Sequence, residues 1–264
     1  MSFLPVRGAA VRRLDLALPP ARMAALRSRR PLKRWRYVGV YRADMMLCVG
    51  HARVAGVPQR WWAVALPDGT LVEGRRGVRL AGGRVEAGND IRLELEETGG
   101  VEVVSPHGRS YVWTRKQALV RVRGVVRAAG RTFELDGDDA FIDDSAGYHA
   151  RHTAWRWSAG LGCTDDGRRV AWNLVDGVHD GDASERTVWI DGEPHEVGAQ
   201  EFAADLSSVG ELRFSEWSAR VASTNIGVMR NRYRQPFGEF SGRLPGGLRL
   251  AEGYGVMEEH DVLW

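Results

Sequence analysis

The sequence is poor in cysteine and has no long apolar run. Only Cys48 and Cys163 occur among its 264 residues, which excludes a disulfide framework and a four-cysteine zinc site. No apolar segment approaches the length that crosses a bilayer, and residues 1–11 lack the continuous apolar stretch of a secretory signal. We therefore expect a soluble, cytoplasmic protein with reduced thiols.

Motifs of several enzyme classes are also missing. The sequence holds no GxSxG elbow, no phosphate-binding GxxxxGKS/T loop, and no HExxH or CxxC metal motif. His149 and His152 would share a face of a helix at their three-residue spacing, but a strand would place them on opposite faces. We therefore expect neither a metal nor an organic cofactor.

Positive charge is concentrated near the N-terminus. The sequence has 37 basic and 34 acidic residues, yet residues 1–36 hold ten basic residues and one acidic residue. Such a block favours a weak contact with an anionic membrane surface. An arginine-rich composition is the simpler explanation, since only Lys33 and Lys116 are lysines. No basic–aromatic stacking motif of an RNA-binding sheet occurs, so no specific nucleic-acid partner is expected.

Helical periodicity is nearly absent, whereas short runs of β-branched and aromatic residues are frequent. Examples are Trp35–Ala43, Met45–Val54 and Gln59–Leu66, which are separated by turn-length gaps. Only Pro20–Arg30 is predicted as a helix, because proline stands in its first turn. Many strands with one helix favour an all-β sandwich or barrel over a parallel α/β sheet, which needs crossover helices.

The chain length and the number of predicted strands favour two all-β halves. Residues 124–138 can serve as the seam between them. We therefore expect an N-terminal β domain over residues 1–125 and a C-terminal β domain over residues 126–264.

Residues that can carry chemistry gather between residues 136 and 180. If His149–Ala159 is one strand, its alternation places Trp155 and Trp157 on one face, as in the lining of a cavity or a core. Trp172 and Asn173 follow on the next predicted strand.

Asp143 and Asp144 have two interpretations. Before residues 145–147 they can form an ordinary turn that bonds its own backbone. Alternatively, a carboxylic acid beside tryptophans in a closed cavity has a raised pKa, because burial disfavours its charged form, and it can then donate a proton at neutral pH. Aromatic faces would stabilise the cation that forms when a carbon–carbon double bond is protonated.

Two parts of the sequence carry family resemblances. Residues 140–147, Ala-Phe-Ile-Asp-Asp-Ser-Ala-Gly, resemble in spacing the Ala-Trp-Met/Phe-Asp-His-x-Trp-Gly box of the carotenoid 1,2-hydratase, tocopherol-cyclase and AttH-like group. An uncharacterised domain-of-unknown-function family, which we place in the same lipocalin-like (calycin) superfamily, is more similar. Its resemblance extends from about Trp35 to Trp264 and rests on His152-Thr-Ala-Trp-Arg-Trp-Ser-Ala-Gly, Asn173-Leu-Val-Asp-Gly, Pro236-Phe-Gly and Gly255–Trp264.

The resemblance implies two lipocalin-like antiparallel β-barrels or sandwiches packed together, with an acid at the edge of an apolar cavity. Asp143 matches the aspartate of the box, whereas Asp144, Ser145 and Ala146 replace its other residues. We therefore expect an acid-catalysed hydratase, cyclase or isomerase that acts on a hydrophobic, unsaturated, lipid- or isoprenoid-like substrate. The alternative is a non-catalytic carrier of such a ligand.

The candidate site follows from both arguments. The candidate catalytic residues are Asp143, Tyr148, His149 and His152. The candidate ligand-binding residues are Arg151, Trp155, Trp157, Trp172 and Asn173. A hydrophobic small molecule is the expected partner.

Overall fold

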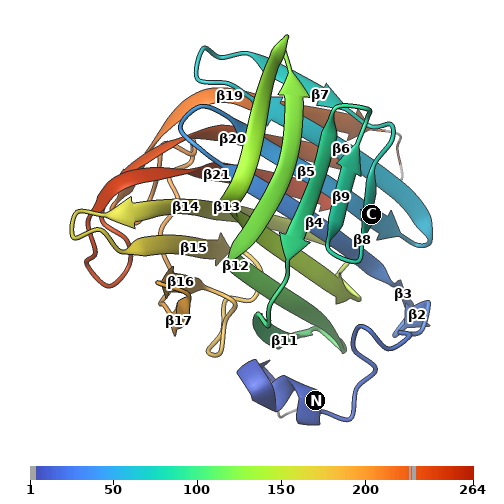
Figure 1. The fold of residues 1–264 in the computed structure, drawn as a ribbon. Coiled ribbons are helices and arrows are strands. Elements are labelled where there is room, and N and C mark those ends of the chain that lie inside the picture. Colours follow the sequence, from blue (N-terminus) through green and yellow to red (C-terminus); the bar gives the residue numbers. More distant parts are fainter. Residues whose placement is uncertain (1–3, 226, 228–229) are drawn as a thin grey trace.

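The computed structural model describes residues 4–225, 227 and 230–264 and consists almost entirely of antiparallel strands (Figure 1). Over these residues the strands form a first sheet of eleven, a second sheet of eight and a two-stranded hairpin. The predicted all-β class is confirmed.

The first sheet takes its strands from the N-terminal part of the chain. It contains β1 (Val6–Arg7), β4 (Lys33–Tyr41), β5 (Met46–Val54), β6 (Val57–Ala65), β7 (Leu71–Gly74), β8 (Arg79–Ala81), β9 (Arg84–Ala87), β10 (Ile91–Glu96), β11 (Val101–His107), β12 (Ser110–Ala128) and β13 (Arg131–Gly147). Its main order is β7-β6-β5-β4-β13-β12-β10-β9-β8, with β11 paired to both β1 and β12.

The second sheet takes its strands from the C-terminal part of the chain. It contains β14 (His152–Thr164), β15 (Arg169–Asp176), β16 (Thr187–Ile190), β17 (Glu193–Glu196), β18 (Ser208–Val209), β19 (Leu212–Asn225), β20 (Arg230–Gly242) and β21 (Leu250–Leu263). Its order is β17-β16-β15-β14-β21-β20-β19-β18. Within the described ranges the end strands of each sheet do not pair with each other, so the architecture is sandwich-like.

One end of each of the strands β4 to β6 is buried on both faces, which explains the continuous apolar runs of residues 37–41, 46–50 and 63–65. On β4, Val38 and Val40 point into a core that the first sheet encloses as it folds over itself, together with residues of β9, β10, β12 and β13. Tyr37 and Tyr41 alternate with them and point into a second core, shared with Trp157 and other residues of the second sheet. The face with the tyrosines therefore meets the second sheet.

The chain passes from one sheet to the other between Gly147 and His152. Residues 124–138, the expected seam, form a hairpin between β12 and β13. The boundary expected between residues 125 and 126 falls inside β12. A division of the chain into two domains at that position stays a prediction.

The helix predicted at Pro20–Arg30 is wrong. The only helix among the described residues is the 3-10 helix η1 (Gly8–Arg13), while β2 (Leu26–Arg27) and β3 (Arg30–Pro31) form a small hairpin. A tertiary contact takes the place of a helical hydrogen bond in this stretch: the backbone carbonyl of Ala24 accepts a hydrogen bond from the Tyr148 hydroxyl at 2.9 Å.

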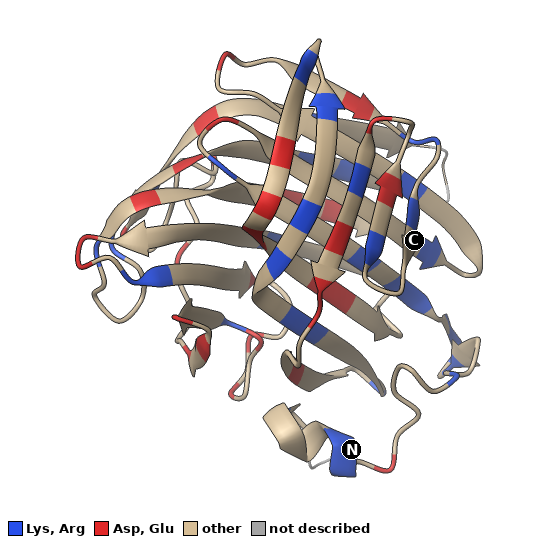
Figure 2. Ribbon diagram, viewed as in Figure 1, with Lys and Arg blue, Asp and Glu red and all other residues tan. Residues whose placement is uncertain are grey.

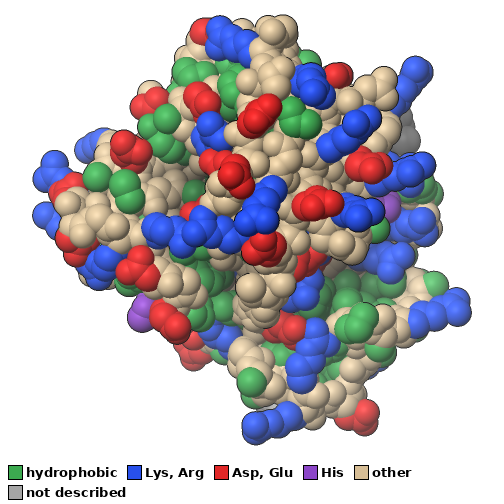
Figure 3. All heavy atoms as spheres, in the orientation of Figure 1, with side chains coloured by type: hydrophobic (Ala, Val, Ile, Leu, Met, Phe, Trp, Pro, Cys, Tyr) green, Lys and Arg blue, Asp and Glu red, His purple; other side chains and the backbone are tan. Residues whose placement is uncertain are grey.

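Charges of both signs are interspersed on the visible face of the molecule (Figures 2 and 3). On β12 and β13 this mixing follows from register, since basic residues of one strand lie opposite acidic residues of the other, as Arg121 lies opposite Asp139. No helix within the described residues is long and apolar enough to cross a membrane.

Several bases of the N-terminal segment are engaged in the fold. Arg12 pairs with Glu102, and the Arg36 guanidinium contacts Asp144 at 2.9 Å. Lys33 is buried and donates to the carbonyl of Ala150. Residues 1–3 lie outside the described residues. These contacts favour a structural role for the basic segment, and its contact with a membrane surface stays a hypothesis.

Candidate functional site

A cavity of about 670 Å³ lies where the inner faces of the two sheets meet. This volume is in the range of sites that hold small molecules. Its wall is mostly apolar and aromatic, and the polar side chains in it come from both sheets. The aromatic side chains in the lining are Trp35, Tyr37, Trp61, Trp155, Trp157, Tyr233 and Trp264.

Strand register builds the wall on the first sheet. Lys116, Asp143, Tyr37, Gly50 and Trp61 lie opposite one another on β12, β13, β4, β5 and β6. Residues directly opposite in antiparallel strands share a face, so this row lines the cavity. Glycine is required in the middle of the row, because a Cβ at position 50 would lie 2.1 Å from the Trp61 ring.

Aromatic contacts join the two walls. The rings of Trp35 and Trp155 are parallel within 6°, with centroids 6.3 Å apart. Tyr37 meets Trp157 edge to face at 5.5 Å. These contacts hold π faces around the cavity, where a cationic intermediate would be stabilised.

Asp143 is buried and shares the Lys116 cation with a second carboxyl group, that of Glu185. Its Oδ1 lies 2.5 Å from Lys116 Nζ, which also lies 3.2 Å from Glu185 Oε1. Its Oδ2 accepts a hydrogen bond from Trp35 Nε1 at 3.2 Å. All three members of the cluster are buried.

The pKa values in this cluster follow from burial and from the shared cation. Burial raises the pKa of Asp143, and Lys116 opposes that effect. Burial also acts on Glu185, but Lys116 and His179 outweigh it and hold the pKa of Glu185 below its ordinary value. Lys116 stays protonated, because the two carboxyl groups raise its pKa against the effect of burial. The Lys116 ammonium group therefore opposes the effect of burial on both carboxyl groups.

Glu258 is a third buried carboxyl group in the cavity wall and lies on β21 of the second sheet. It accepts hydrogen bonds from Trp155 Nε1 at 2.8 Å and from Gln235 Nε2 at 3.2 Å. Burial raises the pKa of Glu258 to about 7, and the nearby charge of Asp143 contributes to the rise. Near neutral pH this group exists in both protonation states, as a general acid requires.

His149 is a neutral and unpaired side chain in the wall. Neither ring nitrogen has a hydrogen-bond partner among the described residues, although the side chain is buried. Its ring lies over Trp35 with centroids 5.1 Å apart and beside His107 at 5.5 Å. Burial, together with His107 and His179, holds the pKa of His149 well below its ordinary value. It can therefore bond a water molecule or a ligand hydroxyl.

The structure brings four of the predicted site residues into the cavity wall, namely Asp143, His149, Trp155 and Trp157. The interpretation of Asp143 and Asp144 as a turn is wrong, because both lie within β13 in the middle of the first sheet. Asp144 points to the opposite face, where Arg36 and Arg115 bind it.

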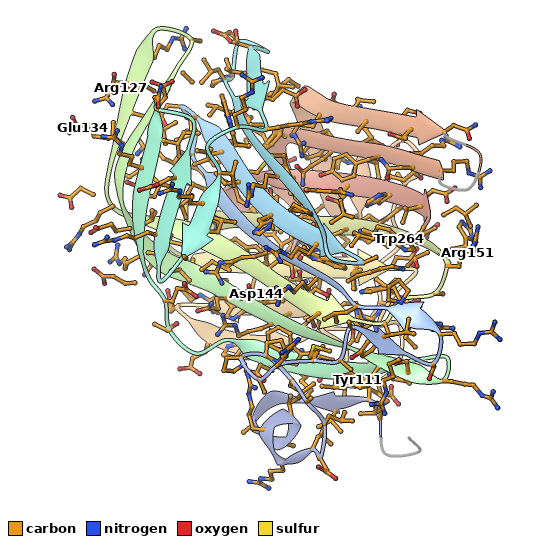
Figure 4. The ribbon with its side chains drawn as sticks, turned by 90° about the vertical axis from the view of Figure 1, so that its right-hand side faces the viewer. Tyr111, Arg127, Glu134, Asp144, Arg151 and Trp264 are labelled. Carbon is orange, nitrogen blue, oxygen red and sulfur yellow. The ribbon has the colours of Figure 1, made fainter. Side chains whose placement is uncertain are left out.

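The other predicted residues lie outside the lining. His152, the first residue of β14, is exposed, and its Nε2 contacts Asp261 at 2.8 Å. Side chains alternate along β14, so Trp155 and Trp157 point into the cavity and His152 points to the other face. Arg151 lies beside Trp264 at one edge of the molecule, far from Asp144 (Figure 4).

Tyr148, Trp172 and Asn173 are also outside the lining but buried. Tyr148 packs in the N-terminal core, and Trp172 belongs to the core on the other face of the second sheet. Asn173 acts behind the wall, where it accepts a hydrogen bond from Trp157 Nε1 at 2.8 Å and donates to the carbonyl of Glu185 at 3.0 Å.

Sequence reasoning missed Lys116, Glu185 and Glu258. One signal was available: the chain uses arginine almost everywhere, and both of its lysines, Lys33 and Lys116, are buried. Glu258 lies in the C-terminal motif that carried the family resemblance. The described residues contain no group of three or more His, Cys, Asp or Glu side chains that could hold a metal ion.

Comparison with known proteins identifies the family. The family described as Domain of unknown function (DUF2804) matches residues 72–264. The chain belongs to this family. The prediction of an uncharacterised domain family is thereby confirmed, and the match covers β12 to β21 and hence most of the cavity wall. No curated protein matches the chain.

Solved structures give remote similarities. A candidate AttH protein from Nitrosomonas europaea is 13% identical with a TM-score of 0.42, over 93% of this chain and 98% of that one. Kievitone hydratase from Nectria haematococca is 9% identical with a TM-score of 0.45, over 86% and 88%. CghA with Sch210972 is 9% identical with a TM-score of 0.40, over 95% of each chain.

Proposed function

We propose that the protein is an acid-catalysed enzyme, a hydratase, cyclase or isomerase, that acts on a hydrophobic unsaturated small molecule. The observation that carries the proposal is the pair of buried carboxyl groups, Asp143 and Glu258, on opposite walls of one aromatic cavity. Both have raised pKa values. Two carboxyl groups with different surroundings supply an acid and a base.

Glu258 is the better proton donor of the two. Its hydrogen-bond partners are neutral, and its pKa of about 7 leaves it substantially protonated near neutrality. Asp143 faces the Lys116 ammonium group, which favours its carboxylate form. The role of donor that the sequence suggested for Asp143 therefore fits Glu258, and Asp143 fits the role of base.

The reaction begins when Glu258 gives its proton to one carbon of a double bond. The neighbouring carbon becomes a cation, which the faces of Trp155, Trp157 and Trp35 stabilise. In a hydratase, water adds to the cation and Asp143 takes the released proton. In an isomerase, Asp143 instead removes a proton from an adjacent carbon, and in a cyclase a second double bond attacks the cation first. Proton return from Asp143 to Glu258 closes the cycle.

A carrier that binds the same ligand without converting it is the rival function. One observation favours it: both oxygens of Asp143 already have partners, Lys116 and Trp35. The expected histidine or tyrosine partner of Asp143 is absent from the hydrogen bonds of the described residues. His149 contacts Trp35 instead.

Native mass spectrometry of protein purified from its own host would identify a co-purifying apolar ligand. Wild-type protein, Asp143→Asn and Glu258→Gln would then be incubated with that ligand. We expect each variant to bind it but to convert it about 100-fold more slowly or worse. Wild-type protein that binds the ligand and leaves it unchanged would establish the carrier instead.

A further inference from the structure

The charged residues of the cavity are separated along its length. The three acidic side chains of the lining, Asp143, Glu185 and Glu258, are all buried. The exposed lining residues are neutral or basic and mark the opening: Pro58, Gln59, Arg60, Arg75, Thr224 and Arg230. Among the described residues, the exposed part of the lining thus contains no acidic residue, while the buried part holds three carboxyl groups beside the Lys116 cation.

Two arginines of the lining have their side chains on the cavity face. Arg75 follows β7, and continuation of the β6–β7 register places it opposite Trp61. Arg220 lies opposite Gln235 on β20, in the row that leads to Glu258. By the same alternation Arg60 and Arg76 point to the other face, where Arg60 lies opposite His51.

Arg220 is held in place and keeps a donor free. Its side chain is 12% exposed, and its guanidinium lies over the Trp61 ring at 5.8 Å and the Tyr233 ring at 5.5 Å. Nε forms an ion pair with Glu73 Oε2 at 3.3 Å, and Nη1 donates a hydrogen bond to the Tyr233 hydroxyl at 3.4 Å. Nη2 has no partner among the described residues. A planar guanidinium with a free edge is suited to bind a carboxylate or phosphate oxygen.

Arg75 adds a second positive charge at the opening. It is exposed and makes no ion pair with an acidic residue in the described part of the chain. A neutral apolar ligand would gain nothing from this charge, whereas an anionic group would be attracted by Arg75 and anchored by Arg220.

We propose that the ligand is an unsaturated amphiphile whose anionic end binds Arg220 and Arg75 at the opening while its apolar body extends to the carboxyl pair. This inference rests on the proposed function, because it names the substrate class of that site.

Fluorescence titration with cis-parinaric acid, a conjugated polyene acid, and with its methyl ester tests the inference. Wild-type protein should bind the acid about tenfold more tightly than the ester. Arg220→Gln and Arg75→Gln should weaken binding of the acid and leave binding of the ester unchanged. Arg76→Gln removes the same charge next to Arg75 on the other face and should change neither. Circular dichroism spectra would establish that each variant is folded.

Competition identifies the anionic group. Palmitate and hexadecyl phosphate should each displace parinaric acid at lower concentration than hexadecanol, and the better of the two anions names the group. Equal affinity of wild-type protein for acid and ester, no binding of the acid, or an equal effect of Arg75→Gln and Arg76→Gln would overturn the inference.

The two proposals can fail separately. Asp143→Asn should keep the preference for the acid, since Asp143 contacts neither Arg220 nor Arg75. If that preference holds while wild-type protein converts no ligand, only the proposed chemistry is contradicted. If conversion occurs without the preference, only the anionic anchor is contradicted.

Discussion

The carboxyl groups of Asp143 and Glu258 face the same cavity, yet the two sheets surround them differently. Asp143 on the first sheet contacts the Lys116 ammonium group, which it shares with Glu185. Glu258 on the second sheet accepts hydrogen bonds from the neutral donors of Trp155, Gln235 and Tyr233, and the Arg220 cation acts on it through charge alone. A buried carboxyl group with a cation can stay charged, whereas one with neutral partners keeps its proton to higher pH. This difference in partners favours Glu258 over Asp143 as the carrier of the exchangeable proton.

The largest effect should come from removing the cation of the first sheet. Lys116→Met leaves Asp143 and Glu185 buried without their partner, so the free energy of unfolding should fall by about 3–5 kcal/mol in urea titrations. Lys33→Met is the matched control, because the Lys33 ammonium group is buried against carbonyl oxygens of His149 and Ala150 rather than carboxylates. Equal losses in the two variants would contradict the ionic role of Lys116.

On the second sheet, the raised pKa of Glu258 should make the stability of the protein depend on pH. The pKa of Glu258 is about 7 in the folded protein and 4.5 in the unfolded one. Its contribution is therefore fully present below pH 4.5 and is lost as the pH rises through 7. The loss amounts to about 3 kcal/mol. Glu258→Gln should lack this decline when unfolding is measured at pH 5 and pH 8, and an unchanged decline would argue that another group causes it.

His260, two residues further along β21, should change the stability with pH in the opposite direction. Burial lowers its pKa to about 4 from 6.5. Its contribution is present above pH 6.5 and is lost as the pH falls towards 4, by about 2 kcal/mol at pH 5. His260→Gln should flatten the acid limb of the stability curve and leave the limb above pH 7 as it is in the wild type. An acid limb that stays steep would contradict the lowered pKa of His260.

The smallest effect should come from removing one hydrogen-bond donor, the indole N–H of Trp155. Trp155→Phe removes the hydrogen bond that favours the charged form of Glu258, so the pKa of that group should rise further by about one unit. Trp35→Phe is the matching change beside Asp143 and should leave the pKa of Glu258 within a few tenths of its wild-type value. Side-chain carboxyl NMR titrations measure both, and a fall in either variant would contradict the assigned donors.

Strands could be predicted from the sequence more fully than the site. Alternation and β-branched runs gave the all-β class, and the Trp155 and Trp157 alternation correctly indicated one face of a strand toward a cavity. Asp143 was correctly singled out, but its position in β13 was not, because two adjacent aspartates before a glycine are typical of a turn. That segment is a strand because it pairs with β12 and β4, whose partner residues lie far from it in the sequence.

The partners in the site depend on the same long-range pairing. Lys116, Glu185 and Glu258 come from three distant segments, and no local pattern shows that the first two share an ion pair. The predicted helix at Pro20–Arg30 failed for a related reason, since a hydrogen bond from Tyr148 fixes its backbone from another part of the chain. The scarcity of lysine was the one local clue to a buried cation.

The central claim is that the cavity holds a carboxylic acid that keeps its proton near neutral pH. The most direct measurement is a pH titration of the side-chain carboxyl signal of Glu258 by NMR of protein with carbon-13-labelled glutamate, assigned by its loss in Glu258→Gln. The account predicts a titration midpoint near pH 7. A midpoint at the ordinary glutamate value of 4.5 would contradict it.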